Sequence, residues 1–141
     1  MNPLRLLLFV LLFGATARGG DGMKPSEMKT KEALHAVIDG QLAAFRKDDY
    51  AGAYVFADGA IKARFSLEDF EHMVRTGFPA IAHSASAKCG LSFDNGDEAV
   101  VNVRVFNADH ESIDYQYTLR RDGEAWRITG VTLLKDQSTA V

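Results

Sequence analysis

FEHMVRTGFP (residues 70–79) and SIDYQYTLRR (residues 112–121) carry two different hydrophobic periods, and the change between them decides the fold class. The first stretch repeats apolar residues at helical spacing: Phe70, Met73, Val74 and Phe78. The second alternates apolar and polar residues, as a strand with one buried face does: Ile113, Tyr115, Tyr117 and Leu119. Pro79 marks the boundary. The sequence therefore predicts helices first and an antiparallel sheet afterwards.

Three helices are predicted before Pro79. The first runs from Thr30 to Arg46 and carries an apolar stripe made of Leu34, Val37, Ile38, Leu42 and Phe45. Gln41 falls within that stripe, so its amide is expected to be buried and hydrogen-bonded. Asp49 and Ser66 are expected to cap the second and third helices. Between these, Ala60 to Phe65 alternates apolar and basic residues and is predicted as a short edge strand.

Four strand-like runs follow Pro79: Ala80 to Phe93, Glu98 to Asn107, Ser112 to Arg121, and Ala125 to Leu134. Asn95-Gly96 and Asp122-Gly123 are typical hairpin turns, and such short links require antiparallel neighbours. Gly130 separates two apolar pairs that are out of step, which predicts a bulge that bends the last strand. The expected fold is α+β, with three N-terminal helices packed in the concave face of a curved antiparallel sheet.

The N-terminal segment predicts that the protein is exported. Met1 to Ala17 has the basic residue, short apolar run and small-x-small site of a signal peptide, the alternative being a buried N-terminal helix. Residues 18–29 are expected to form a flexible leader, 30–135 a single domain and 136–141 a tail. Cleavage removes Arg5, which leaves 15 of the 16 basic residues against 19 acidic ones. This acidic balance gives no electrostatic support for nucleic-acid binding. No membrane span is expected in the mature chain.

Metal, disulfide and nucleophile chemistry receive little support from the sequence. Cys89 is the only cysteine, so it cannot form an internal disulfide, and it is interpreted as a structural thiol. The four histidines lack metal-ligand spacing, so neither a metal nor another cofactor is expected. His83 shares a predicted strand face with Ile81 and Ala85, which makes it a candidate for lining a cavity or a hydrogen-bonded core histidine.

The candidate cavity-lining residues are polar or aromatic side chains expected on inner faces: Gln41, Tyr54, Phe78, His83, Tyr115, Tyr117 and Trp126. The alternative is that these aromatics simply fill a small core. No catalytic residue is assigned.

Four segments carry a resemblance to a known superfamily: residues 41–45 (QLAAF), 53–57 (AYVFA), 70–74 (FEHMV) and 126–131 (WRITGV). With Asp49 between the first two, they resemble the nuclear-transport-factor-two-like superfamily, also called SnoaL-like or ketosteroid-isomerase-like. Within that superfamily they resemble most an uncharacterised bacterial family, domain of unknown function number 4864. The resemblance implies a cone-shaped, cystatin-like fold with an internal cavity and implies homodimerisation through the sheet. In ketosteroid isomerases a general-base aspartate follows the second helix, and the matching position here is Arg64, which cannot accept a proton.

The leading hypothesis is an exported, non-catalytic domain that binds a small apolar ligand or a partner protein. One alternative is an isomerase- or dehydratase-like enzyme that uses a polar pair inside the cone. The other is a structural interaction module with a filled core. A cavity of about 300 Å³ or more would favour ligand binding.

Overall fold

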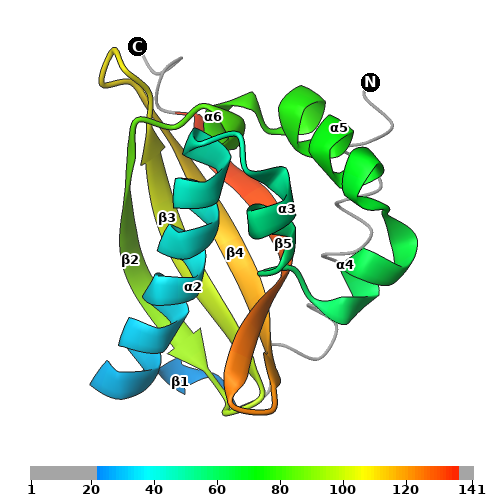
Figure 1. Ribbon diagram of the computed structural model, residues 1–141. Helices are drawn as coiled ribbons and strands as arrows, with labels where there is room; N and C mark the ends of the chain where they lie inside the picture. The colour runs from blue at the N-terminus through cyan, green and yellow to red at the C-terminus, as the bar shows by residue number, and fades with distance from the viewer. Residues whose placement is uncertain (1–21, 137–141) are drawn as a thin grey trace.

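The computed structural model describes residues 22–136 and contains one antiparallel sheet with helices packed on one face (Figure 1). The sheet has the order β1-β2-β3-β4-β5, so each strand pairs with its neighbour in sequence. Its strands are β1 (Lys24–Pro25), β2 (Ser86–Asp94), β3 (Glu98–Phe106), β4 (Ser112–Asp122) and β5 (Ala125–Asp136). The predicted α+β class and the helices-then-sheet order are confirmed.

Between residue 22 and β2 the structure has five helical segments: α2 (Met28–Arg46), α3 (Tyr50–Tyr54), α4 (Gly59–Arg64), α5 (Leu67–Gly77) and α6 (Pro79–Ala82). The predicted caps are present, because Asp49 accepts a hydrogen bond from the Gly52 N–H and Ser66 accepts one from the Asp69 N–H. Figure 1 shows α2 and α3 against the sheet, with α4 and α5 beyond the β5 edge. The helices and the inner sheet face thus enclose the core.

The edge strand predicted over Ala60 to Phe65 is wrong, because this segment forms helix α4. Asp58 caps it by accepting a hydrogen bond from the Ala60 N–H at 3.1 Å. Ile61 and Phe65 are four residues apart and both buried, while the basic residues between them are exposed. A four-residue repeat satisfies a period of two as well as a helical period, so alternation alone could not distinguish the two structures.

The strand predicted from Ala80 begins too early. Pro79 occupies the first turn of α6, where its fixed φ angle and missing N–H fit a helix start. β2 starts only at Ser86. His83 is therefore the C-cap of α6 and is exposed to solvent, so its predicted position on an inner strand face is wrong.

The leader predicted to be flexible is structured over its second half. Lys24 and Pro25 pair with Asp94 and Phe93, and the Ser26 hydroxyl donates to Asp94 Oδ1 at 2.6 Å. α2 begins at Met28, two residues before the predicted start. The predicted signal peptide, residues 18–21 of the leader, and residues 137–141 of the tail lie outside the described residues.

The predicted bulge near Gly130 is present, with Thr129 as the extra residue. Thr118 pairs with Gly130 while Leu119 pairs with Ile128, so Thr129 has no partner on β4. The extra residue brings Ile128 and Val131 to the same side, where both line the core cavity described below, whereas Leu133 is 41% exposed. A second bulge lies in β2, between Cys89 and Ser92. Both irregularities bend the sheet around the helices.

Candidate functional site

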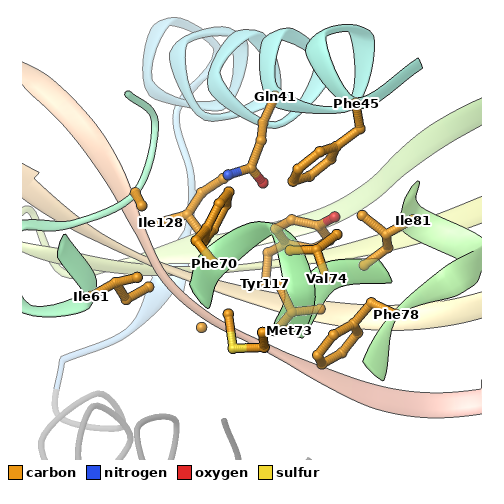
Figure 2. A pocket seen from close by; sticks show the side chains of 13 residues that line it. Gln41, Phe45, Ile61, Phe70, Met73, Val74, Phe78, Ile81, Tyr117 and Ile128 are labelled. Atoms are coloured by element: carbon orange, nitrogen blue, oxygen red, sulfur yellow. The ribbon is translucent and has the colours of Figure 1, made fainter. Parts of the chain in front are cut away.

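A small cavity lies between the helices and the inner face of the sheet (Figure 2). Its walls come from α2, α4, α5 and α6 on one side and from β4 and β5 on the other. Thirteen residues line it: Gln41, Phe45, Ala57, Ile61, Phe70, Met73, Val74, Phe78, Ile81, Tyr117, Ile128, Gly130 and Val131. Its volume is about 40 Å³. This is enough for a few water molecules and well below the several hundred Å³ of a drug-sized pocket.

Gln41 reaches the cavity because it lies in the apolar stripe of α2. Its side chain is only 4% exposed, as the sequence predicted. The amide Nε2 donates to the Ala53 carbonyl at 3.1 Å, which ties α2 to α3. Figure 2 shows the amide oxygen turned toward the other lining side chains. No hydrogen bond to this oxygen is found within residues 22–136.

Tyr117 reaches the same cavity from β4, where alternation directs it to the helices. Its side chain is 0% exposed, and its hydroxyl has no hydrogen-bond partner among the described residues. Burial raises the pKa of this hydroxyl far above its usual range, and neighbouring Tyr115, Cys89 and Asp39 add to the shift. The hydroxyl therefore remains protonated and available as a donor.

Of the other five sequence candidates, Phe78 also lines the cavity, and the other four lie elsewhere. Phe78 joins Gln41 and Tyr117 in the lining and also packs on Tyr115, with ring centroids 6.1 Å apart. Tyr54 donates to the carbonyl oxygens of Lys62, at 3.2 Å, and Phe65. The Trp126 ring lies beneath the Arg121 guanidinium at 5.6 Å. Of the seven candidates, the structure brings three into the cavity.

Several lining residues carry a misleading local sequence pattern or none. The pattern around Ile61 and Ile81 predicts strands, although each residue belongs to a short helix. The capping aspartate before Gly59 and the proline at the start of α6 were the available signals. Ala57 lines the cavity because residues 57 and 128 form an isolated parallel bridge. No local sequence pattern predicts such a bridge.

The cavity lining offers little for acid–base or metal chemistry. None of its thirteen residues carries a carboxylate, imidazole, amine or thiol. Arg64 is exposed at the end of α4 and is not among them. Within the described part of the chain, no three His, Cys, Asp or Glu side chains are grouped to hold a metal ion. The lining instead suits an uncharged molecule with an apolar body.

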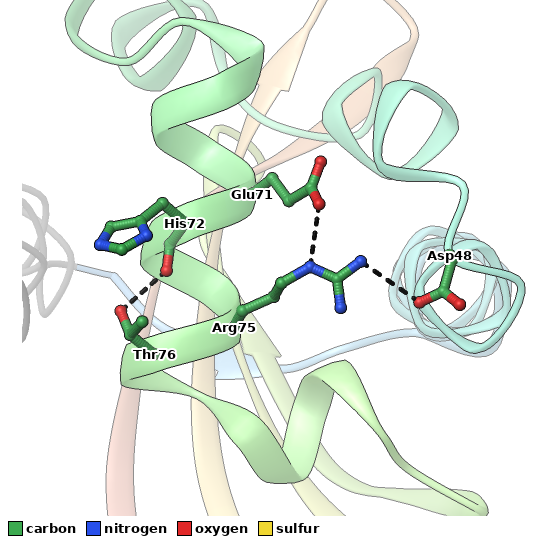
Figure 3. Close-up of polar contacts among 5 residues, drawn as sticks. All are labelled: Asp48, Glu71, His72, Arg75 and Thr76. Carbon is green, nitrogen blue, oxygen red and sulfur yellow. Dashed lines mark hydrogen bonds and ion pairs between the residues drawn. The ribbon is translucent and has the colours of Figure 1, made fainter.

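One wall of the cavity, helix α5, is tied to the α2–α3 junction (Figure 3). Arg75 pairs with Glu71 at 2.9 Å on the same helix and with Asp48 at 3.5 Å across the junction. Its guanidinium also lies 4.5 Å from the centroid of the Tyr50 ring. His72 points away from this cluster in the view of Figure 3. These contacts join α5 to the α2–α3 junction, but they contribute little to the free energy of unfolding, because they are exposed and solvent screens them.

A polar contact that the sequence did not predict joins α2 to the β2 bulge. His35 Nε2 lies 3.1 Å from the Ser92 hydroxyl, on the inner side of the sheet. Burial lowers the pKa of His35, and the charge of Lys31 lowers it further, against opposing effects from Asp39 and the Gly90 carbonyl. One turn further along, the Cys89 thiol lies 4.0 Å from Asp39 Oδ1. Both contacts lie outside the cavity lining and attach the helix to the sheet.

Within the described residues, no helix is long and apolar enough to cross a membrane. A family model described as "Domain of unknown function (DUF4864)" matches residues 27–141. No curated protein matches the sequence.

Solved structures that resemble this one include the following two. The 1.8 Å structure of Aln2 from a Streptomyces species is 12% identical, covers 79% of this chain and 94% of that chain, and has a TM-score of 0.48. The structure of Bd1075 from Bdellovibrio bacteriovorus is 14% identical, with coverage of 76% and 41% and a TM-score of 0.50. At such identity the likeness to Bd1075 concerns the fold alone, and this chain spans less than half of that protein. The family and the helix-lined, curved-sheet fold predicted from sequence are confirmed.

Proposed function

We propose, for a chain that belongs to the DUF4864 family of unknown function, a non-catalytic role in which the core cavity takes up a small apolar molecule. One observation carries this proposal. The cavity has an almost wholly apolar lining, yet two polar atoms beside it have no hydrogen-bond partner among the described residues: the fully buried Tyr117 hydroxyl, and Gln41 Oε1, which is turned toward the lining side chains (Figure 2). Buried polar groups are usually paired, so an occupant that pairs with these two is expected.

The same lining argues against the alternative of an acid–base enzyme. Proton transfer at carbon needs a group that titrates near the working pH, and the lining supplies only a neutral amide and a tyrosine whose pKa is raised. The cavity volume of about 40 Å³ is below the size expected of a ligand pocket and by itself favours the alternative of a filled core. That alternative leaves the Tyr117 hydroxyl without a partner among the described residues, at a cost of about 1 to 3 kcal/mol.

Native mass spectrometry of the protein purified from its own cell tests the proposal. We expect a bound mass that leaves the chain on denaturation. Val131→Phe adds bulk to the cavity wall on β5 and should abolish that mass. Val100→Phe makes the same change on β3, outside the cavity lining, and should retain it. Circular dichroism of both variants establishes that they fold. A chain without any adduct, or an adduct that survives Val131→Phe, contradicts the proposal.

We also propose that the domain forms a homodimer through the sheet face opposite the helices. A shallow groove of about 380 Å³ runs over β2, β3 and β4 there, and Leu91 and Leu134 on its walls are 65% and 50% exposed. Arg104 and Asp114 form a bidentate pair in the same groove, at 2.7 and 3.0 Å. Light scattering of wild type and Leu91→Lys tests this, because a charge at a dimer interface should release monomers.

Export of the mature chain is proposed from the residues before the described part. Intact-mass measurement of the protein in the extracytoplasmic fraction should give a chain that begins after Ala17. A product that retains residues 6–13 contradicts export by signal peptide cleavage.

A further inference from the structure

We propose that the ligand of the core cavity is a compact, neutral molecule that carries a hydroxyl group, which accepts from Tyr117 and donates to Gln41. This inference rests on the proposed function and specifies the chemistry of its ligand. It follows from three properties of the cavity: the kinds of unpartnered polar atom beside it, its lack of charge and its size.

The polar atoms require an occupant that both donates and accepts. Tyr117 offers a hydroxyl proton, and Gln41 presents its carbonyl oxygen to the cavity (Figure 2), because the bond from Nε2 to Ala53 turns the amide nitrogen toward α3. A ketone or ester could accept from Tyr117 but would leave the Gln41 oxygen unpaired. A hydroxyl has a donor and two acceptor lone pairs, so it can pair with both.

The absence of charged side chains in the lining excludes an ionised ligand. Transfer of a carboxylate or ammonium from water into such a site would cost many kcal/mol without an opposite charge. Desolvation of a neutral hydroxyl costs far less, and two hydrogen bonds offset that cost. The ligand's remaining surface must match the aromatic and aliphatic walls.

The size of the cavity restricts the ligand to a compact body. An engineered apolar cavity of about 150 Å³ in another protein accommodates benzene, whereas this cavity measures about 40 Å³. Entry therefore needs rearrangement of lining side chains. Met73 lines the cavity, and its unbranched side chain can adopt new rotamers at small cost. A five-membered ring is a suitable probe of the space that such movement creates.

Three probes of the same ring size test the inference on the full chain: cyclopentanol, cyclopentanone and cyclopentane. Binding is followed through the methyl NMR signals of Met73, Ile61 and Ile81, which line the cavity. Tyr117→Phe removes only the hydroxyl. Tyr50→Phe makes the same change at a buried, unpartnered hydroxyl outside the lining and serves as the matched control.

We expect wild type to bind cyclopentanol more tightly than cyclopentanone. Tyr117→Phe should weaken cyclopentanol binding about two- to tenfold, as expected for loss of one neutral hydrogen bond, and should not weaken cyclopentane binding. Tyr50→Phe should change neither affinity. Since every comparison of variants uses one probe, differences in probe hydration cancel.

The outcomes separate the two proposals. If cyclopentane binds but cyclopentanol shows no dependence on Tyr117, the cavity takes ligands and the hydroxyl assignment is overturned. If cyclopentanone binds more tightly than cyclopentanol, the ligand group is a pure acceptor, and the assignment is again overturned. If no probe shifts the methyl signals at millimolar concentration, the cavity holds water only, and the proposed function fails together with this inference.

Discussion

Gln41 Nε2 and the Ala53 carbonyl oxygen lie 3.1 Å apart, and this hydrogen bond joins the middle of α2 to α3. The bond fixes which way the amide points, because the nitrogen faces α3 and leaves the oxygen toward the cavity. One side chain thereby anchors two helices and supplies the cavity with an acceptor. The anchoring part can be measured without any ligand.

Gln41→Leu should lower the free energy of unfolding by about 0.5 to 1.5 kcal/mol, since it removes the side-chain hydrogen bond between α2 and α3 while the Ala53 carbonyl keeps its bond from the Phe56 N–H. Urea denaturation measures the change. Gln116→Leu, on the opposite face of the sheet and partly exposed, is the control and should stay close to wild type. Equal stability of Gln41→Leu and wild type would refute an anchoring role for the amide.

In ligand-free protein, Tyr117→Phe and Tyr54→Phe should change the free energy of unfolding in opposite directions. Tyr117→Phe removes an unpartnered buried hydroxyl and should raise the free energy of unfolding by about 1 kcal/mol. Tyr54→Phe removes the hydroxyl that bonds the Lys62 and Phe65 carbonyls and should lower it by about the same amount. Both changes are measured by urea denaturation of protein that has been refolded to free it of ligand. A loss of stability in both variants would mean that water already pairs with Tyr117.

The predictable parts of the fold were those in which local chemistry and tertiary packing agree. Ser66 at the start of α5 and the alternation of Tyr115, Tyr117 and Leu119 each favour a single structure, and both predictions are confirmed. The segment Ala60 to Phe65 satisfied two periods at once, so its helix could not be distinguished from a strand. Short segments are the weakest case, because a single turn of helix contains too few repeats to establish a period.

The cavity was predictable only in part. The position of Gln41 in an apolar stripe signalled a buried amide, and β alternation placed Tyr117 on the inner face. Which aromatics share one cavity depends on how α5 and α6 pack against the sheet, and that arrangement arises from contacts distant in sequence. For the same reason, the bond between His35 and Ser92, 57 residues apart, has no local signature.

His35 should make stability depend on pH below neutrality. Burial, with the charge of Lys31, lowers the pKa of His35 below its ordinary value of 6.5. As the pH falls below about 6.5, the unfolded chain takes up this proton first, so the free energy of unfolding decreases until the folded pKa is passed. Well above pH 6.5 the ring is neutral in both the folded and the unfolded chain and contributes no such dependence.

Urea denaturation at about pH 7.5 and about pH 5 measures the effect. The loss of stability between the two should be smaller in His35→Gln than in wild type. His72→Gln removes an exposed histidine on α5 and should behave like wild type. Identical pH dependence in all three proteins would show that His35 titrates alike in the folded and unfolded chain.

Cys89 should be slow to react in the folded protein, because the thiolate is the reactive form. Burial, with the nearby Asp39 carboxylate, raises the pKa of Cys89 from 9.0 to about 12, which makes the thiolate fraction at pH 8 roughly a thousandfold smaller. Alkylation by iodoacetamide, followed by mass spectrometry, should therefore be at least about a hundredfold slower in native protein than in urea. The control is Ser86→Cys in a Cys89→Ser background, which places a thiol at an exposed position of the same strand and should react at the rate of a free cysteine. Native Cys89 reacting as fast as this control would contradict its interpretation as a structural thiol.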